Sequence, residues 1–377
     1  MTELLVGTKK GLFVLEGDPG GGFAVRTRAF AGEPVEYAMR DPRSGRVLVS
    51  VTSGWYGPKI WYADDPAGEW EQAAGVALPE GGDTALERIW TIVAGEADGT
   101  LYAGGDPGVL FTSADGGATW ALHRPLWEHP TRPDWQPGGG GLCLHSIVPW
   151  PGDPDRLALA LSAVGVWLTD DGGETWEHGN AGIVPRYLPD DAPPDTINLC
   201  VHNLHRAPRR PERLFLQFHG GVYRSDDAGE SWTDIAAGLP SDFGFPLELD
   251  PADPDSAYLI PLTADVDRDT PGGRVRTYET RDAGASWTPR DTGLPRQDAY
   301  LTVLREAFAR AGAGTTLELY FGATSGAVYG SGDAGASWFD VATHLPPVLS
   351  VSAGEGAAQR RSRGTSTVTR VPPPGGE

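Results

Sequence analysis

A short motif recurs five times along the chain and constrains its fold more than any other feature. It reads Ser/Thr-x-Asp-x-Gly-x-Ser/Thr-Trp, and we call each copy an aspartate turn; the copies span 113–120, 169–176, 225–232, 280–287 and 331–338. Their aspartates are 56, 56, 55 and 51 residues apart, and two degenerate copies, at 65–70 and 18–23, precede them at similar spacing. Self-similarity at a period near 50 residues is typical of repeat architectures, and it divides this chain into seven units.

Every residue type in the aspartate turn has a local structural reason to be there. The carboxylate can accept backbone N–H bonds within its own turn, and glycine supplies a positive φ that other residues resist. The tryptophan can anchor the hairpin in the apolar layer between units. We therefore expect these aspartates, Asp227 among them, to stabilise the fold and not to catalyse a reaction.

The pattern around each turn predicts four short strands per unit. In the third unit the apolar stretches are 88–93, 100–103, 109–112 and 120–122. Four strands per unit at this period predict an all-β, seven-bladed β-propeller.

The two ends of the chain predict how the ring closes. The sequence begins with a second-strand pattern at 4–7 and ends its apolar pattern with an unmatched stretch at 348–351. We interpret this stretch as the innermost strand of the first blade, so that both termini build one blade. Residues 1–353 are thus predicted to form a single propeller, and residues 354–377, which lack a core-forming pattern, a disordered C-terminal tail.

The aspartate turns resemble the Asp-box (BNR) repeat of sialidase-like propellers, and the resemblance covers about residues 1–353. The segments 6–13, 139–146, 221–225 and 239–246 resemble a bacterial cytoplasmic subgroup that is labelled glycosyl hydrolase or exo-alpha-sialidase by similarity. The resemblance implies a propeller with a hydrolase-like function. The same repeat also occurs in endoglucanases, sortilin-type receptors and photosystem-assembly propellers, so it is specific for the fold and not for the function.

Charge and composition exclude several classes of partner. The chain has 51 acidic and 30 basic side chains, a net charge of −21, which argues against nucleic acid or an anionic membrane surface as the main partner. No stretch approaches the ~18 apolar residues of a membrane span, and the start lacks the pattern of a signal peptide. Two cysteines make no disulfide framework, so we expect a cytoplasmic protein.

Strand order predicts which face of the propeller holds a site. The aspartate turns join third to fourth strands, so they share one face, and the loops that enter each innermost strand lie on the opposite face. The longest irregular segments, 126–141, 179–196 and 263–273, all belong to that second face. Since loops that converge on a propeller channel carry function, we expect a ligand site at the channel mouth there.

Histidines concentrate on the same face. His145 and His202 occupy matching positions in consecutive innermost strands, each two residues after a cysteine (Cys143 and Cys200), and His219 lies in a turn of the same blade as His202. The histidines either act as acid–base or hydrogen-bonding groups at the channel mouth or simply pack, and the cysteines are expected to pack between blades. A metal site at the histidines is the least favoured alternative, because equivalent positions of adjacent blades point in the same rotational sense. No cofactor is predicted.

Charged and aromatic residues complete the candidate site. In so acidic a chain, a local cluster of Lys, Arg and His indicates an anionic ligand such as a carboxylate, a phosphate or an acidic sugar; the alternative is ordinary surface ion pairing. If histidines attract that anion, its binding should weaken as the pH rises through their range. The candidate catalytic residues are Glu87, His145, His202, His219 and Asp242. The candidate ligand-binding residues are Lys9, Trp55, Arg88, Asp106, Arg132 and Trp135.

The motifs leave enzyme and scaffold open. Sialidases begin with Arg-Ile-Pro, whereas the nearest match here, 88–90, reads Arg-Ile-Trp and falls in the third unit, which argues against sialidase activity. A glycosidase of another type needs two carboxylates about 5–10 Å apart, and the candidates are Glu87, Asp106, Asp134 and Asp242. One hypothesis is a hydrolase-like enzyme that acts on a small anionic or sugar-like molecule. The other is a non-catalytic propeller that binds a protein or a glycan.

Overall fold

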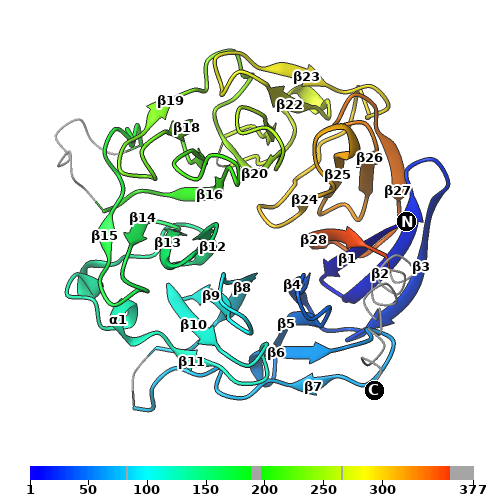
Figure 1. The fold of residues 1–377 in the computed structure, drawn as a ribbon. Helices are drawn as coiled ribbons and strands as arrows, with labels where there is room; N and C mark the ends of the chain where they lie inside the picture. The colour runs from blue at the N-terminus through cyan, green and yellow to red at the C-terminus, as the bar shows by residue number, and fades with distance from the viewer. Residues whose placement is uncertain (82–83, 188–196, 265, 357–377) are drawn as a thin grey trace, which may run out of the picture.

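The computed structural model describes residues 1–81, 84–187, 197–264 and 266–356. They form seven four-stranded antiparallel sheets that surround a central channel (Figure 1). The predicted all-β, seven-bladed propeller is confirmed. In this part of the chain, no helix has the length and apolar character needed to cross a membrane.

The first four blades follow the predicted units. The first consists of β28 (Val348–Glu355), β1 (Thr2–Thr8), β2 (Gly11–Asp18) and β3 (Gly22–Ala29). The second consists of β4 (Val35–Arg40), β5 (Val47–Ser53), β6 (Gly57–Ala63) and β7 (Glu71–Gln72). The third consists of β8 (Arg88–Ala94), β9 (Leu101–Asp106), β10 (Val109–Ser113) and β11 (Ala121–Leu122). The fourth consists of β12 (Leu144–Trp150), β13 (Asp153–Leu161), β14 (Gly165–Thr169) and β15 (Glu177–His178).

The last three blades repeat the same order. The fifth consists of β16 (Val201–Arg206), β17 (Leu214–Phe218), β18 (Gly221–Ser225) and β19 (Thr233–Asp234). The sixth consists of β20 (Gly244–Leu249), β21 (Ala257–Pro261), β22 (Thr277–Thr280) and β23 (Thr288–Arg290). The seventh consists of β24 (Phe308–Ala311), β25 (Glu318–Gly322), β26 (Val328–Ser331) and β27 (Phe339–Ala342). Short helical turns lie in the loops: α1 (Arg124–Trp127), η1 (Arg132–Asp134), η2 (Pro271–Gly273) and η3 (Gly314–Thr316).

Pairing of the two ends of the chain closes the ring, as predicted. β28 pairs antiparallel with β1 from Thr2 opposite Glu355 to Thr8 opposite Val348, and β1 in turn pairs with β2. The closing strand begins at Val348, inside the predicted stretch, and runs two residues past the predicted boundary at 353. The proposed tail beyond residue 356 lies outside the described residues.

The five aspartate turns share one hydrogen-bond pattern. In the fifth blade, Asp227 Oδ1 accepts the Ser231 backbone N–H at 2.9 Å, and its Oδ2 accepts the Ser231 hydroxyl. Ser225 Oγ donates to Asp227 at 2.7 Å and accepts the Gly229 N–H at 2.9 Å, while Gly229 adopts a φ of 103°. Burial raises the pKa of Asp227, but the hydrogen bonds from Ser231 outweigh it, so the net pKa lies below the ordinary range. The aspartates are therefore bound within their own turns.

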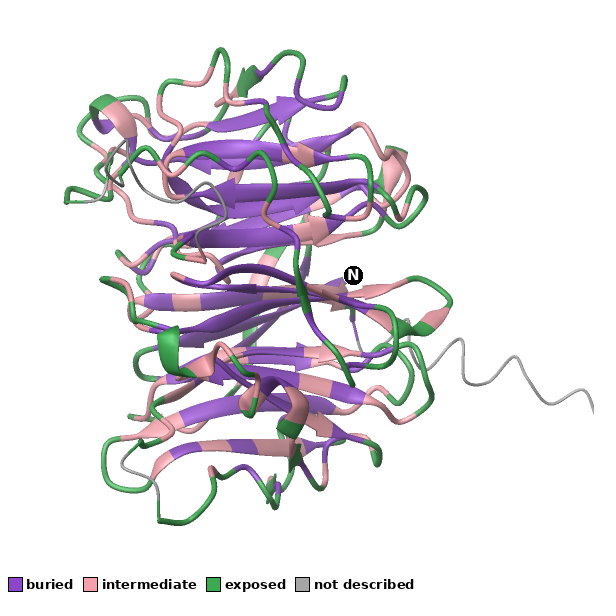
Figure 2. Cartoon of the chain, turned by 90° about the vertical axis from the view of Figure 1, so that its left-hand side faces the viewer, coloured by how far each residue is buried: buried purple, intermediate pink, exposed green. Residues whose placement is uncertain are grey.

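Two tryptophans of the aspartate turns bond directly to the preceding blade. Trp232 Nε1 donates to the carbonyl of Gly179 in the preceding unit at 2.8 Å, and Trp287 Nε1 donates to Ile235 O at 2.7 Å. Both rings are almost fully buried. Figure 2 shows the burial of the whole chain: buried residues follow the strands, and exposed residues gather in the connecting loops at both faces.

Removal of the closing strand tests the ring. A chain that ends at residue 347 lacks β28 and exposes the unpaired edge of β1, so we expect aggregation or a melting temperature far lower than that of the full chain. The fall in melting temperature should greatly exceed ~2–4 °C, which is the shift that a destabilisation of about 1 kcal/mol typically causes in larger domains. A chain that ends at residue 356 keeps every described strand and is the matched control. Equal melting of the two truncated chains, measured by calorimetry, would contradict the closure.

The turns predict a specific stability defect. Asp227→Ala leaves the Ser231 N–H without its acceptor, and we expect the free energy of unfolding to fall by about 1–2 kcal/mol in chemical denaturation. Glu230→Ala, which removes an exposed carboxylate from the same turn, should leave it within about 0.5 kcal/mol. Equal effects of the two substitutions would show that the aspartate has no special structural role.

Candidate ligand site at the channel mouth

A cavity of about 570 Å³ opens at the end of the channel where the innermost strands begin. Its walls include the loop 136–140 that enters the fourth blade, the β17–β18 turn, and residues at or just before the starts of β4, β8, β16, β20 and β24. In an antiparallel blade these positions all lie at the face opposite the third-to-fourth-strand turns. The cavity is therefore on the face predicted for a site, and every blade contributes to it.

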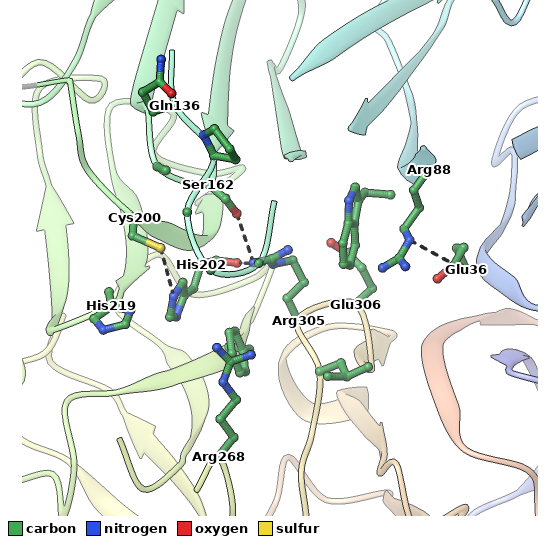
Figure 3. A pocket seen from close by; sticks show the side chains of 18 of the residues that line it. Glu36, Arg88, Gln136, Ser162, Cys200, His202, His219, Arg268, Arg305 and Glu306 are labelled. Carbon is green, nitrogen blue, oxygen red and sulfur yellow. Dashed lines mark hydrogen bonds and ion pairs between the residues drawn. The ribbon is translucent and has the colours of Figure 1, made fainter. Parts of the chain in front are cut away.

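Arg305 occupies the centre of the cavity in Figure 3. Its Nε donates to the carbonyl of His202 at 2.9 Å, and its Nη2 donates to Ser162 Oγ at 3.4 Å. Its guanidinium lies 5.0 Å from the Trp90 ring and 5.8 Å from the Phe245 ring. These partners belong to the third, fourth, fifth and sixth blades, and they fix the guanidinium of Arg305 within the cavity.

Two further arginines line the same cavity. Arg88, the first residue of β8, lies 4.6 Å above the Trp90 ring and pairs with Glu36 at 3.5 Å. Arg268, from the β21–β22 loop, lies 5.6 Å from the Phe245 ring. Together with Arg305, they bring three guanidinium groups to one enclosure.

Two carboxylates, Glu36 and Glu306, line the cavity beside these arginines, and burial raises the pKa of both. Burial raises the pKa of Glu36, although the charge of Arg88 opposes the shift. Burial also raises the pKa of Glu306 to about 8; Arg305 opposes this shift and Glu248 adds to it. Tyr37 is a further titratable group near Glu306, and burial raises its pKa strongly. Glu306 is therefore largely uncharged at neutral pH.

A sulfur and two imidazoles lie together on the wall of the cavity. Cys200 Sγ is 3.5 Å from His202 Nε2, and the ligating atoms of Cys200, His202 and His219 all lie within 4.8 Å of one another. His202 is buried, and its Nδ1 lies 2.7 Å from Gly244 O. Cys200 directly precedes β16, and its carbonyl accepts the N–H of His219 across the β16–β17 hairpin at 3.1 Å. The hairpin thus places all three side chains together.

Three of the candidate catalytic and ligand-binding residues line this cavity: Arg88, His202 and His219. Cys200, which was expected to pack between blades, also lines it. His145 does not line it, although it matches His202 in position. Its ring is buried between blades, with Nε2 2.9 Å from Val201 O and Nδ1 3.0 Å from Ser146 Oγ. The expectation that His145 reaches the channel mouth is corrected.

His145 and His202 are also not cationic groups. Burial, and secondarily the charge of Arg305, holds the pKa values of His145 and His202 well below their usual range. Both rings are neutral near pH 7. The expected loss of anion binding through the histidine range therefore has no basis in these two residues.

Trp135 and Arg132 anchor the long loop and do not form the rim of the cavity. Trp135 is buried against the Trp167 ring at 5.0 Å, and its Nε1 donates to Thr131 Oγ1 at 3.0 Å. Arg132 donates to Gly108 O at 2.6 Å, and burial lowers its pKa to about 10. Trp55 is 90% exposed in the β5–β6 turn and is not part of the wall.

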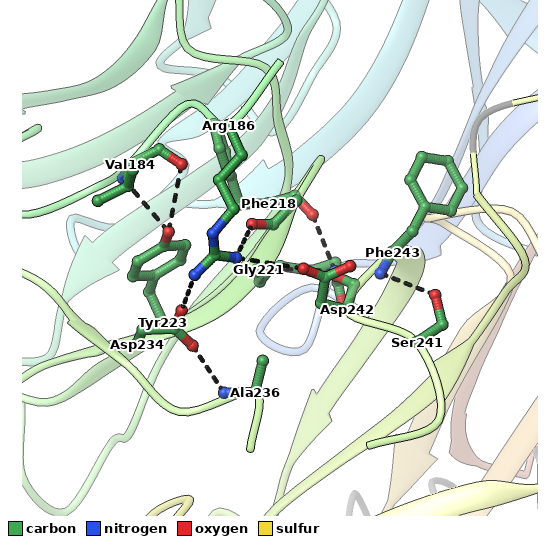
Figure 4. A network of polar contacts seen from close by, with 12 residues as sticks. Val184, Arg186, Phe218, Gly221, Tyr223, Asp234, Ala236, Ser241, Asp242 and Phe243 are labelled. Carbon is green, nitrogen blue, oxygen red and sulfur yellow. Dashed lines mark hydrogen bonds and ion pairs between the residues drawn. The ribbon is translucent and has the colours of Figure 1, made fainter. Parts of the chain in front are cut away.

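The remaining candidates lie near the cavity but outside its wall. Lys9 and Glu87 are exposed residues of turns at the mouth. Asp106 packs behind the loop 136–140, 3.5 Å from Cys143 Sγ, and burial raises its pKa. Asp242 pairs with Arg186 at 3.2 Å, in the network of Figure 4.

Sequence reasoning missed Glu36, Arg305 and Glu306 as site residues. Arg305 and Glu306 lie just before β24, as Glu87 and Arg88 lie at the start of β8, and Glu36 is the second residue of β4. The available signal was therefore positional: a charged residue where an innermost strand begins faces the channel mouth.

The fold and this cavity define a seven-bladed β-propeller with an arginine-rich pocket at one mouth of its channel. Comparisons with family models and with curated proteins found no match. Among solved structures, the chain is similar to an ancestral GH74 enzyme, with a TM-score of 0.54 and 17% identity over 85% of this chain. It spans 38% of the length of that enzyme.

A second similar structure is YCF48 from Cyanidioschyzon merolae, with a TM-score of 0.50 and 13% identity over 81% of this chain and 83% of that one. YCF48 bound to D1 peptide matches with a TM-score of 0.49 and 14% identity over 85% of this chain and 84% of that one. At such identities the similarity shows the shared propeller fold alone.

The state of Glu306 predicts a pH dependence of stability. Its folded-state pKa of about 8 lies above the ordinary value of 4.5, so between these values the folded chain retains a proton that the unfolded chain releases. The stability of the wild type should therefore fall as the pH rises from about 5 to 8, relative to Glu306→Gln. Urea unfolding at pH 5, 6.5 and 8 measures this difference, with the exposed Glu87→Gln as control. Parallel pH profiles for the wild type and Glu306→Gln would contradict the assignment.

Proposed function

We propose that this protein binds a small anionic ligand, such as a carboxylate, a phosphate or an acidic sugar, in the cavity at the channel mouth. The observation that supports this most directly is the gathering of Arg88, Arg268 and Arg305 in one enclosure. Glu36 offsets Arg88 through their ion pair, and Glu306 is largely protonated at neutral pH. The cavity therefore keeps a positive charge within a chain whose net charge is −21.

The way the arginines are held suits recognition of an oxyanion. Arg305 is fixed by hydrogen bonds and by the rings of Trp90 and Phe245, so little side-chain freedom is lost when it binds a ligand. A guanidinium presents paired N–H donors that match a carboxylate or a phosphate, and such charge-assisted bonds strengthen away from bulk water. The volume of about 570 Å³ accommodates a small molecule and not a folded partner.

Hydrolysis is a second candidate function, favoured by Glu306. A general acid must hold a proton at the working pH, and burial gives Glu306 a pKa of about 8. Glu36 would supply the second carboxylate that a glycosidase-like reaction requires. This reaction would use the same anionic or sugar-like ligand, so the binding test comes first.

Binding can be measured by calorimetry with a panel of phosphate, citrate, glucuronate and a sialic acid, with glucose as the neutral counterpart. We expect at least one anion to bind and glucose not to bind. Arg268→Gln should weaken the binding about 10- to 100-fold, the equivalent of one charge-assisted hydrogen bond of roughly 1.5–3 kcal/mol. Arg268 is an exposed loop residue, so its loss should leave the fold intact.

Arg281→Gln is the matched control, because Arg281 is an exposed arginine in an aspartate turn on the opposite face. The affinity of the Arg281→Gln variant for the anion should equal that of the wild type. The proposal would be contradicted if neither Arg268→Gln nor Arg305→Gln changed the affinity for the anion. A chain that binds no member of the panel would favour the non-catalytic scaffold that binds a protein or a glycan. Turnover of a bound acidic glycoside that Glu306→Gln abolishes would support hydrolysis.

A further inference from the structure

We propose that Cys200, His202 and His219 bind a divalent transition-metal ion of the zinc class, with a fourth coordination position open to the cavity. Nothing in this proposal depends on the nature of the anionic ligand. It rests on the geometry of the three ligating atoms, on the hydrogen bonds that orient them, and on their place in the cavity wall.

The distances match a tetrahedral site. Zinc–sulfur and zinc–imidazole bonds of about 2.3 and 2.0–2.1 Å place sulfur and nitrogen roughly 3.5 Å apart around one tetrahedral ion. Cys200 Sγ and His202 Nε2 are 3.5 Å apart. His219 brings its nitrogen within 4.8 Å of both, and a side-chain shift of about 1 Å would complete the set.

A backbone carbonyl orients His202 as a metal ligand. Gly244 O can only accept, so at 2.7 Å it fixes the proton of His202 on Nδ1. The lone pair of Nε2 then points toward Cys200 Sγ. Metal-binding histidines commonly donate their second N–H to a carbonyl or carboxylate in this way, which fixes both the tautomer and the ring orientation.

The turn that carries His219 is held from two sides. The N–H of His219 donates to Cys200 O at 3.1 Å, and the N–H of Gly221 donates to Asp242 O at 3.2 Å. Arg186 donates to the carbonyl of Gly220 at 2.9 Å. It also binds the carboxylate of Asp242, as Figure 4 shows. The Arg186–Asp242 pair is therefore an outer support of the cluster.

Apolar rings enclose the cluster on its inner side. Phe243 lies 5.2 Å from the rings of both His202 and His219, and Phe245 lies 4.6 Å from His202. All three ligands also line the cavity, so one side of the cluster faces ligand and solvent. Three protein ligands with an open fourth position are typical of catalytic zinc sites, whereas structural sites are closed by four.

Charge in the cavity is compatible with such an ion. Arg305 lines the same cavity and opposes a cation, and burial raises the pKa of Cys200, so the ion has to displace the thiol proton and bind the thiolate, which removes one unit of its charge. A metal shared by the histidines of adjacent blades was disfavoured from the sequence, and in the structure the ring of His145 bonds to Val201 O within the core and does not line the cavity. The proposed set uses Cys200 in its place.

Metal uptake by the full-length chain tests the proposal. After incubation with Zn²⁺ and dialysis, we expect about one zinc per chain by mass spectrometry of the metal content. The Co²⁺ form should show visible absorption of a tetrahedral ion and a thiolate-to-cobalt charge-transfer band. Cys200→Ser should abolish that band, and His219→Ala should weaken binding by more than the roughly 10–100-fold typical of an outer-shell partner.

Two variants serve as matched controls, and circular dichroism checks that each chain is folded. Cys143→Ser removes the other cysteine, which bonds to Gly140 O and Asp106, and should leave the charge-transfer band intact. His344→Ala removes an exposed histidine outside the cavity and should leave the affinity unchanged. If Cys200→Ser does not fold, X-ray absorption of the wild-type zinc form must still show one sulfur ligand with nitrogen ligands. Substoichiometric binding, a zinc shell without sulfur, or a band that persists in folded Cys200→Ser would overturn the proposal.

Discussion

The antiparallel pairing of β28 with β1 is the interaction on which the rest of the structure depends. Blades of a propeller cover one another's apolar faces, so an open ring would leave two faces exposed to water. Gly7 lies at the seam, where a Cβ would come within 2.4 Å of Ser350 Oγ and 2.6 Å of Val35 O. Closure thus depends on a close approach of β1, β28 and β4. It also brings seven strand starts to a single mouth, which creates the cavity.

The two faces of the ring differ, since one repeats a stabilising turn and the other carries the cavity of the proposed ligand site. On one face, five aspartate turns repeat nearly the same hydrogen bonds, as the pairs Asp115–Thr119 and Asp333–Ser337 illustrate. On the other face the contributions differ between blades, since the third brings Arg88, the fifth brings Cys200 and His202, and the seventh brings Arg305 and Glu306. A stable repeated framework of this kind lets individual loop residues differ without loss of the fold.

The sequence predicted the fold almost completely because each unit contains its own local signal. The Asp–Gly–Trp spacing is a property of a single turn, and the unmatched stretch at 348–351 could pair only with the incomplete first blade. The site was predicted only in part. Arg88, His202 and His219 were found from their positions, whereas Arg305 and Glu306 precede a strand whose start no motif marks.

The candidates that were placed wrongly show that a position along a strand does not by itself determine whether the side chain faces the cavity. His145 and His202 both bond to a carbonyl of the next blade, at Val201 and Gly244, yet only His202 faces the cavity. Which side of an inner strand remains open depends on the loops packed above it. Trp135 illustrates the same limit, because a tryptophan in a Gly/Pro-rich loop can line a pocket or fix the loop, and here it packs against Trp167.

The central claim is that ring closure assembles an anion site from residues of separate blades. The most direct measurement is a crystal structure of the protein soaked with selenate, with the selenium located by its anomalous scattering. We expect a selenate inside the cavity, bonded to Arg305 and to at least one of Arg88 and Arg268. Selenate found only at exposed arginines of the opposite face, such as Arg281, with the cavity free of it at the same concentration, would contradict the account.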